Sequence, residues 1–158
     1  MQSDWFQYNK AKVIQALRYH FISRKEIKVM MILVNVFAVL SAILFYSKKI
    51  SPLAFLVSSF LWFVLMITFW HLLPRSIYKR SATFQDRLQV AAEESGLTIE
   101  NERGRQSWRW TDFSSWMETP YFFHLYFNSR SFFIVPKEAF PGDRESEFRM
   151  WLKKQIRS

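Results

Sequence analysis

The sequence predicts a membrane α-helical hairpin followed by an α+β domain. Two long uncharged apolar blocks predict the hairpin, one between Lys28 and Lys48 and one between Lys49 and Arg75. Further along, short alternating runs of aromatic and β-branched residues are typical of strands, and the last segment has apolar residues at helical spacing. We therefore expect an N-terminal segment (1–28), a hairpin (29–74) and a C-terminal domain (75–158).

Both apolar blocks are long enough to cross a bilayer. They contain 19 and 25 uncharged residues, and a hydrocarbon core about 30 Å thick needs roughly 20 helical residues. We expect spans at about 29–47 and 53–73. The alternative is a pair of core helices in a soluble bundle, but such helices keep a polar stripe facing water and neither block has one. The first block also begins too late, and runs too long, for a cleaved signal peptide.

The distribution of charge predicts how the hairpin is oriented. The net charge is +9, yet residues 91–158 carry ten basic and ten acidic residues, so the excess lies on residues 1–90. Basic residues gather before the first span and after the second, whereas the connecting loop has only Lys48 and Lys49. This bias places both termini in the cytoplasm. Because the soluble part is neutral, we expect no nucleic-acid partner.

Residues 9–23 predict an amphipathic helix that leads into the first span. Ile14, Leu17 and Phe21 recur at helical spacing, and the polar side is basic. Such a segment lies on an anionic membrane surface or docks onto the protein's own domain. The sequence leaves both possibilities open, including whether residues 1–28 join the cytoplasmic sheet.

Small residues in the apolar blocks predict where the two spans pack. Neither block contains Gly, but Ala38 pairs with Ala42 and Ala54 with Ser58 at a spacing of four. All four lie in the halves next to the external loop, so we expect the helices to approach most closely there. His71 lies between Trp70 and Pro74 at the cytoplasmic interface, where an anchoring role is favoured over ion transport.

The C-terminal part predicts several strands and a final helix. The strand runs are LTIEN (97–101), SWRWTDF (107–113), with Trp108 and Trp110 on one face, YFFHLYF (121–127), apolar on both faces and therefore central, and SFFIV (131–135). Pro136 cannot donate to a β ladder and ends the last run, after which Lys137 and Glu138 begin a solvated turn and Phe140 returns to the core. Residues 82–92 fit a helix or a strand equally well.

Two of these motifs carry a resemblance to a known family. The chain resembles the YcxB-like family of small bacterial membrane proteins through a Trp-x-Asp step (Trp110, Asp112) and a Pro-Lys-x-x-Phe ending (Pro136, Lys137, Phe140). The resemblance implies an inner-membrane protein whose cytoplasmic domain is a strongly bent, pleckstrin-homology-like antiparallel sheet closed by a C-terminal helix. It implies no reaction and no cofactor.

The residue inventory favours binding over catalysis. The chain has no Cys, its three His are far apart in sequence, and its three Gly form no phosphate-binding loop. We expect no enzyme activity, cofactor or metal. The expected function is binding of a protein partner or an anionic lipid, with Arg103, Arg105 and Arg109 as candidate contacts if the strand extends back through Gly104. The alternatives are a solvated arginine face and, for the whole protein, immunity against a membrane-targeted toxin. A homo-oligomer is compatible with the sequence.

Overall fold

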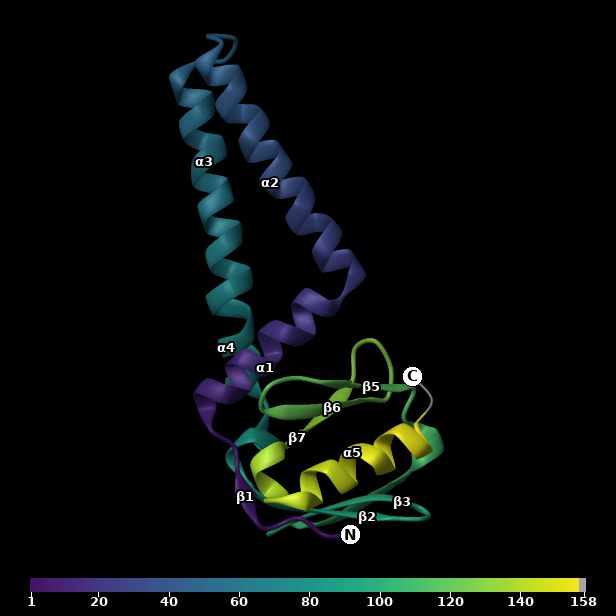
Figure 1. Ribbon diagram of the computed structural model, residues 1–158. Coiled ribbons are helices and arrows are strands. Elements are labelled where there is room, and N and C mark those ends of the chain that lie inside the picture. Colours follow the sequence, from purple (N-terminus) through teal and green to yellow (C-terminus); the bar gives the residue numbers. More distant parts are fainter. Residues whose placement is uncertain (157–158) are drawn as a thin grey trace. The chain divides into compact units, whose positions relative to one another are not determined.

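The computed structural model describes residues 1–156 and divides the chain into two compact units (Figure 1). Met1–Ala16 and Ser81–Ser158 form the first unit, here named the α+β domain, and Leu17–Arg80 form the second, here named the hairpin unit. Residues 157–158, the end of the predicted C-terminal domain, lie outside the described residues. The α+β class predicted for the soluble part is confirmed.

The hairpin unit is built from long apolar helices. The helix α1 (Lys10–Ser23) begins in the α+β domain and ends in the hairpin unit, followed by α2 (Lys25–Tyr46) and α3 (Pro52–Ile67). A π-helical turn, η1 (Thr68–Leu72), continues α3 into α4 (Leu73–Arg80). The helices at 25–46 and 52–80 are long and apolar enough to span a membrane.

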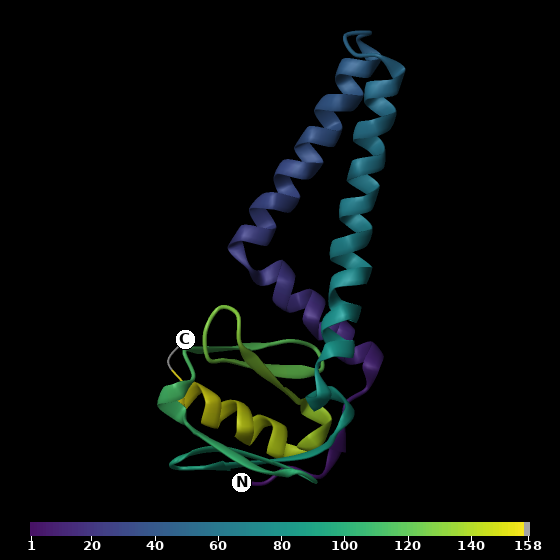
Figure 2. The same ribbon diagram turned by 180° about the vertical axis from the view of Figure 1, so that it is seen from behind.

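The loop end of the hairpin is closed by specific contacts. The Ser51 hydroxyl accepts a hydrogen bond from the Ala54 N–H (3.2 Å), and Pro52 occupies the first turn, so α3 starts with a regular N-cap. Ser41 Oγ and Ser58 Oγ lie 2.6 Å apart across the two helices. From this end α2 and α3 diverge along their length, as two opposite views show (Figures 1 and 2).

The first sheet of the α+β domain has the strand order β1-β2-β3-β4, with every pair antiparallel. Its strands are β1 (Phe6–Gln7), β2 (Arg87–Glu93), β3 (Gly96–Asn101) and β4 (Gly104–Arg109). The ambiguous stretch 82–92 contains a 3-10 turn, η2 (Ala82–Gln85), and then most of β2. Gly96 is required at the start of β3 because a Cβ there would lie 2.0 Å from the Trp108 carbonyl oxygen.

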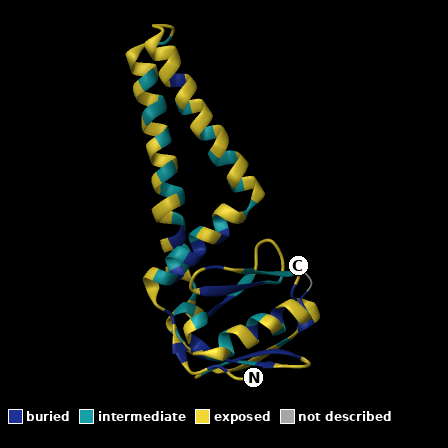
Figure 3. Cartoon of the chain, in the orientation of Figure 1, coloured by how far each residue is buried: buried dark blue, intermediate teal, exposed yellow. Residues whose placement is uncertain are grey.

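The second sheet has the order β5-β6-β7 and packs with the C-terminal helix. It contains β5 (Ser115–Glu118), β6 (Phe122–Tyr126) and β7 (Phe132–Pro136), so the YFFHLYF run is central, as predicted. After the turn η4 (Lys137–Ala139), α5 (Asp143–Gln155) lies between the two sheets in both views. Phe148 and Leu152 of α5 are fully buried, whereas other residues along the helix are exposed (Figure 3).

One predicted strand is shorter than expected. The strand β4 ends at Arg109, and residues Trp110–Asp112 form a 3-10 turn, η3, so Trp108 and Trp110 do not share a strand face. The Asp112 carboxylate accepts the Arg109 N–H at 2.9 Å, which stabilises the turn instead of the extended chain. Trp110 turns into the core, where its Nε1 donates to the Glu93 carbonyl at 2.8 Å.

The N-terminal segment joins the sheet of the α+β domain. Its two-residue strand β1 pairs with β2, and beyond the strand the Ser3 N–H donates to the Val90 carbonyl at 2.7 Å. The Tyr8 hydroxyl donates to the Ile134 carbonyl in β7 at 2.6 Å and is buried. Residues 1–8 therefore contact both sheets, so this part of the N-terminal segment joins the domain.

We predict that Tyr8→Phe lowers the stability of the α+β domain by about 1 kcal/mol, because it removes one buried hydrogen bond and leaves the rest of the ring in place. Burial raises the pKa of the Tyr8 hydroxyl well above its usual range, so the donor keeps its proton at any working pH. Thermal unfolding of the full-length protein in detergent, followed by near-ultraviolet circular dichroism, measures the change. The control is Tyr121→Phe, whose ring is 45% exposed. Equal melting temperatures for the two variants would contradict the prediction.

Candidate functional site

An aromatic groove with arginines at its rim is the most distinctive surface feature of the α+β domain. It has a volume of about 440 Å³ and lies between β3–β4 of one sheet and the β6–β7 hairpin of the other. Leu88 and Ile99 are buried at its floor, while Arg103 and Arg105 are exposed. The walls are formed by four aromatic side chains: Trp108, Phe127, Phe132 and Phe133.

The structure brings together two of the three predicted arginines. Arg103 lies in the β3–β4 turn and Arg105 in β4, and both line the groove. Arg109 is at the far end of β4 and does not line it. The strand β4 begins at Gly104, so Arg103 lies in the turn before it and does not extend the strand. Gly104 has a φ of 151°, which a residue with a side chain rarely adopts.

Each of these arginines has an acidic neighbour. Arg103 pairs with Asp86 at 2.9 Å, Arg105 with Glu100 across the β3–β4 ladder at 3.6 Å, and Arg109 with Asp112 at 3.5 Å. These pairs are largely solvent-exposed, so each contributes little stability. They do reduce the net positive potential that an approaching anion meets. The arrangement therefore suits hydrogen bonding to a partner better than capture of a highly charged ligand.

The Pro-Lys-x-x-Phe residues lie in a second cluster, under the C-terminal helix. Phe140 is buried and its ring stacks on Phe148 of α5 at a centroid distance of 4.4 Å. The sequence predicts a solvated Lys137, and this prediction is wrong. The Lys137 side chain is only 17% exposed, and its ammonium lies 2.6 Å from the Glu118 carboxylate. The reason is that acidic partners arrive from β5 and α5, which are distant in sequence.

This cluster is an ion network above an aromatic ring. Arg149 of α5 contacts Glu118 at 2.8 Å and Glu145 at 2.6 Å, and both Arg149 and Lys137 lie over the Phe123 ring. Hydrogen bonds from Arg149, with those of Lys137, lower the pKa of Glu118 from 4.5 to about 2, and Glu118 in turn raises that of Arg149. The network ties β5, the end of β7 and α5 together. Glu118, Glu145 and Arg149 had no signal in the sequence beyond the early-acid, late-base pattern of the helix.

The described residues show no arrangement of metal-binding side chains. Across residues 1–156, no group of three His, Asp or Glu side chains is placed to hold a metal ion. His124 is buried in β6, with its Nε2 3.2 Å from the Thr119 hydroxyl, which fits the core role that its aromatic strand predicts. His71 lies in η1 and His20 in α1.

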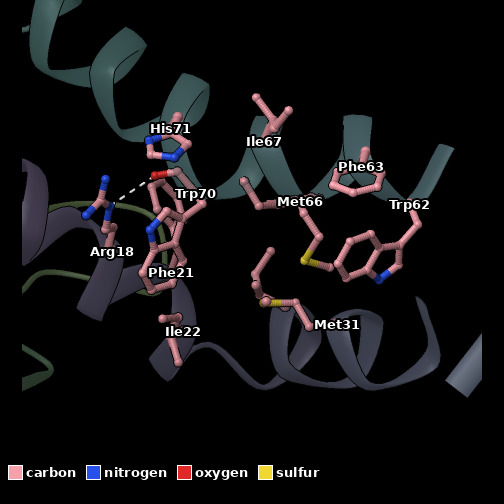
Figure 4. Close-up of a pocket in the computed structure, with 12 residues that line it drawn as sticks. Arg18, Phe21, Ile22, Met31, Trp62, Phe63, Met66, Ile67, Trp70 and His71 are labelled. Atoms are coloured by element: carbon pink, nitrogen blue, oxygen red, sulfur yellow. Dashed lines mark hydrogen bonds between the residues drawn. The ribbon is translucent and has the colours of Figure 1, made fainter. Parts of the chain in front are cut away.

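The hairpin unit has a pocket of its own, with one polar and one apolar end (Figure 4). Its volume is about 350 Å³. In the close-up, Arg18 and His71 lie at one end and Trp62 and Phe63 at the other. The apolar lining comes from four helical segments and consists of Phe21, Ile22, Ile27, Met31, Trp62, Phe63, Met66, Ile67, Phe69 and Trp70.

The polar end of this pocket follows from the position of Pro74. In a regular α-helix the Trp70 carbonyl would accept from residue 74, but proline has no N–H. The chain forms the π-helical turn η1 here, in which the Leu73 N–H donates to the Thr68 carbonyl. Arg18 Nε donates to the Trp70 carbonyl at 3.0 Å, and its guanidinium lies 5.0 Å from the Trp70 ring centroid. Arg18 thus gives the Trp70 carbonyl a donor in place of the N–H that Pro74 lacks.

Three of the four predicted packing residues line a shallow groove between α2 and α3. These are Ala38, Ala42 and Ser58, while Ala54 is not among the lining residues. Deeper along the same groove, Trp62 Nε1 donates to Asn35 Oδ1 at 3.3 Å. The role of the four small residues in packing stays a prediction, to be tested by bulky substitution at Ala42 or Ser58.

We predict that Glu118→Gln destabilises the domain at neutral pH and weakens its dependence on acid. Because the folded-state pKa of about 2 lies below the ordinary 4.5, the stabilisation is present above pH 4.5 and is lost as pH falls towards 2. The loss at pH 7 should not exceed about 1 kcal/mol, since the pair is partly exposed. Urea unfolding at a series of pH values measures it. The wild-type and variant curves should converge between these two pH values, whereas Glu147→Gln, which removes an exposed charge on α5, should parallel the wild type. Curves that stay apart at low pH would contradict the prediction.

Comparison with known proteins gives one match. The family described as YcxB-like protein matches residues 93–152, from the last residue of β2 into α5. No match was found among curated proteins or solved structures. The matched segment contains Trp110 and Asp112, and also Pro136, Lys137 and Phe140, on which the resemblance was based. Residues 93–152 are therefore similar to the YcxB-like family.

Proposed function

We propose that this protein is a non-catalytic integral protein of the inner membrane that recognises a protein partner through its α+β domain. The hairpin crosses the bilayer twice, both termini are cytoplasmic, and the domain is a pleckstrin-homology-like module. The observation that carries the recognition role is the aromatic groove rimmed by Arg103 and Arg105.

The exposure of the hairpin supports the membrane part of the proposal. In the most apolar 18-residue stretch of α2, only 6% of the residues are buried within the protein. In the corresponding stretch of the helix at 52–80, none is buried. Core helices of a soluble protein would be mostly buried, because large exposed apolar surfaces are costly in water. A bilayer removes that cost. The basic flanks and the two-lysine loop support cytoplasmic termini.

The composition of the groove supports a protein partner. Tryptophan and arginine are enriched among residues that dominate binding at protein interfaces, and here Trp108 and Arg105 both line the groove. The strand β4 is also the edge of its sheet and is mostly exposed, so alternate backbone groups face outward. An extended partner segment could pair with this edge and place a side chain in the groove.

The acidic partners of the arginines favour protein over lipid at this site. Asp86 and Glu100 offset the charges of Arg103 and Arg105 locally. A phosphate-rich surface would have to compete with these carboxylates, whereas a peptide can use the remaining donors and the aromatic walls. Binding of anionic lipid by the domain is therefore the less favoured half of the sequence-based expectation.

We predict that Arg105→Glu and Trp108→Ala each lower partner capture by the full-length protein about tenfold, the loss expected for a contact that dominates an interface. The tagged protein is crosslinked in its native membrane and the co-purifying proteins are quantified. The matched control is Lys154→Glu, an equal charge reversal on the exposed side of α5.

Point variants are preferable to truncation in this experiment. A fragment of residues 76–158 would lack β1, so its failure to bind would not distinguish recognition from misfolding. Capture that survives both groove substitutions would contradict recognition by the groove. It would move recognition to the spans and the external loop, where the immunity alternative places the contact with a toxin.

A further inference from the structure

The pocket of the hairpin unit has the shape and polarity of a site for an amphiphile. The helices α2 and α3 meet at the loop and diverge towards their other ends (Figures 1 and 2), and Met31 of α2 and Met66 of α3 both line the pocket (Figure 4). The last turns of α1 contribute Phe21 and Ile22 to the lining of this space. The result is an open apolar wedge rather than a closed core, with Ile67 still 49% exposed.

The polar end of the wedge is positively charged. Arg18 uses Nε for the Trp70 carbonyl, and among the described residues its two terminal nitrogens have no hydrogen-bond acceptor. His71 lies at the same end, and none of the residues lining the pocket is acidic. Further basic residues surround the ends of the helices in sequence: Arg24, Lys25, Lys28 and Arg75. This environment differs from the groove of the α+β domain, where each rim arginine has a carboxylate partner.

The charge and lining of the wedge indicate what can occupy it. One end carries Arg18 and the rest of the lining is almost entirely apolar, so an occupant needs an anionic group joined to an apolar tail. The apolar blocks of a second copy of this chain contain no acidic residue that could meet Arg18. An unbranched alkyl chain is thin enough to follow the wedge past Met31 and Met66, two flexible side chains that adapt to irregular apolar ligands.

We propose that this pocket binds one anionic phospholipid of the cytoplasmic leaflet. Its phosphate is held by the terminal nitrogens of Arg18, with His71 beside it, and one acyl chain lies along the apolar wall towards Trp62. The inference rests on the proposed membrane insertion of the hairpin. It adds a lipid site that is separate from the groove of the α+β domain.

The test is native mass spectrometry of the full-length protein with phosphatidylglycerol or phosphatidylcholine of the same acyl composition. Wild type should retain one phosphatidylglycerol about tenfold more than phosphatidylcholine. Both lipids offer the same phosphate to Arg18, but the choline cation of phosphatidylcholine offsets that charge and is repelled by the basic end of the pocket. Arg18→Gln should abolish that preference. Met66→Trp, which fills the apolar wall and leaves Arg18 in place, should reduce retention of both lipids.

Two matched controls separate the pocket from general effects. Arg80→Gln removes an equal charge, and Leu61→Trp adds equal bulk; neither residue lines the pocket, so both variants should behave as wild type. Equal retention of the two lipids, unchanged retention in Met66→Trp, or displacement of lipid by a second copy would overturn the proposal. Flotation of native membranes that contain the full-length protein tests insertion independently. Protein absent from the floated bilayer would overturn the membrane proposal as well, whereas inserted protein without lipid preference would overturn the lipid site alone.

Discussion

The pairing of the N-terminal segment with β2 is the constraint on which the rest of the molecule depends. It makes the α+β domain out of two pieces of chain, with the whole hairpin unit inserted between Gln7 and Arg87. Closing a flexible loop of about 80 residues costs about 4 kcal/mol of chain entropy. A preformed antiparallel hairpin brings its two ends to the same side and shortens the effective loop to about 25 residues, which lowers that cost by about 1 kcal/mol. Helix pairing and domain closure therefore favour each other.

The family motifs are explained by the corners of the domain rather than by chemistry. Trp110 and Asp112 form the turn that carries the chain from the first sheet to the second. The Trp110 indole donates a hydrogen bond to the Glu93 carbonyl, and the Asp112 carboxylate caps the turn by accepting the Arg109 N–H. Pro136 ends β7, and Lys137 and Phe140 then attach the chain to α5 through the ion network and the ring stack. Both motifs thus lie where the direction of the chain changes and where the helix must be held between the sheets.

Periodicity predicted the long elements, and it failed where the deciding partner is distant in sequence. The two apolar helices of the hairpin unit, β6 and α5 have enough residues for their pattern to be unambiguous. The strand β1 has two residues, too few for any pattern, and β2 was ambiguous until its pairing with β3 was known. The arginine site was predicted in part: alternation placed Arg105 and Arg109 on one strand face, but Asp86 comes from before β2 and no local pattern could pair it with Arg103. The prediction that Lys137 is solvated was wrong for the same reason, because its partner Glu118 lies 19 residues away in the sequence.

The two candidate sites differ in how their positive charge is balanced, and this difference supports the proposal of a different ligand for each. In the α+β domain the acids and bases pair with each other, so attraction to a charged surface is short-ranged and screened within about 8 Å at physiological salt. In the hairpin unit the basic residues outnumber their acidic partners, and Arg24 has only a 3.9 Å contact with Glu26. In the proposed membrane orientation, anionic headgroups accumulate at the basic ends of the hairpin helices, close to Arg18. The proposed partner of the α+β domain, where acids and bases nearly balance, is then recognised by shape and by hydrogen bonds, for which an aromatic groove next to a sheet edge is well suited.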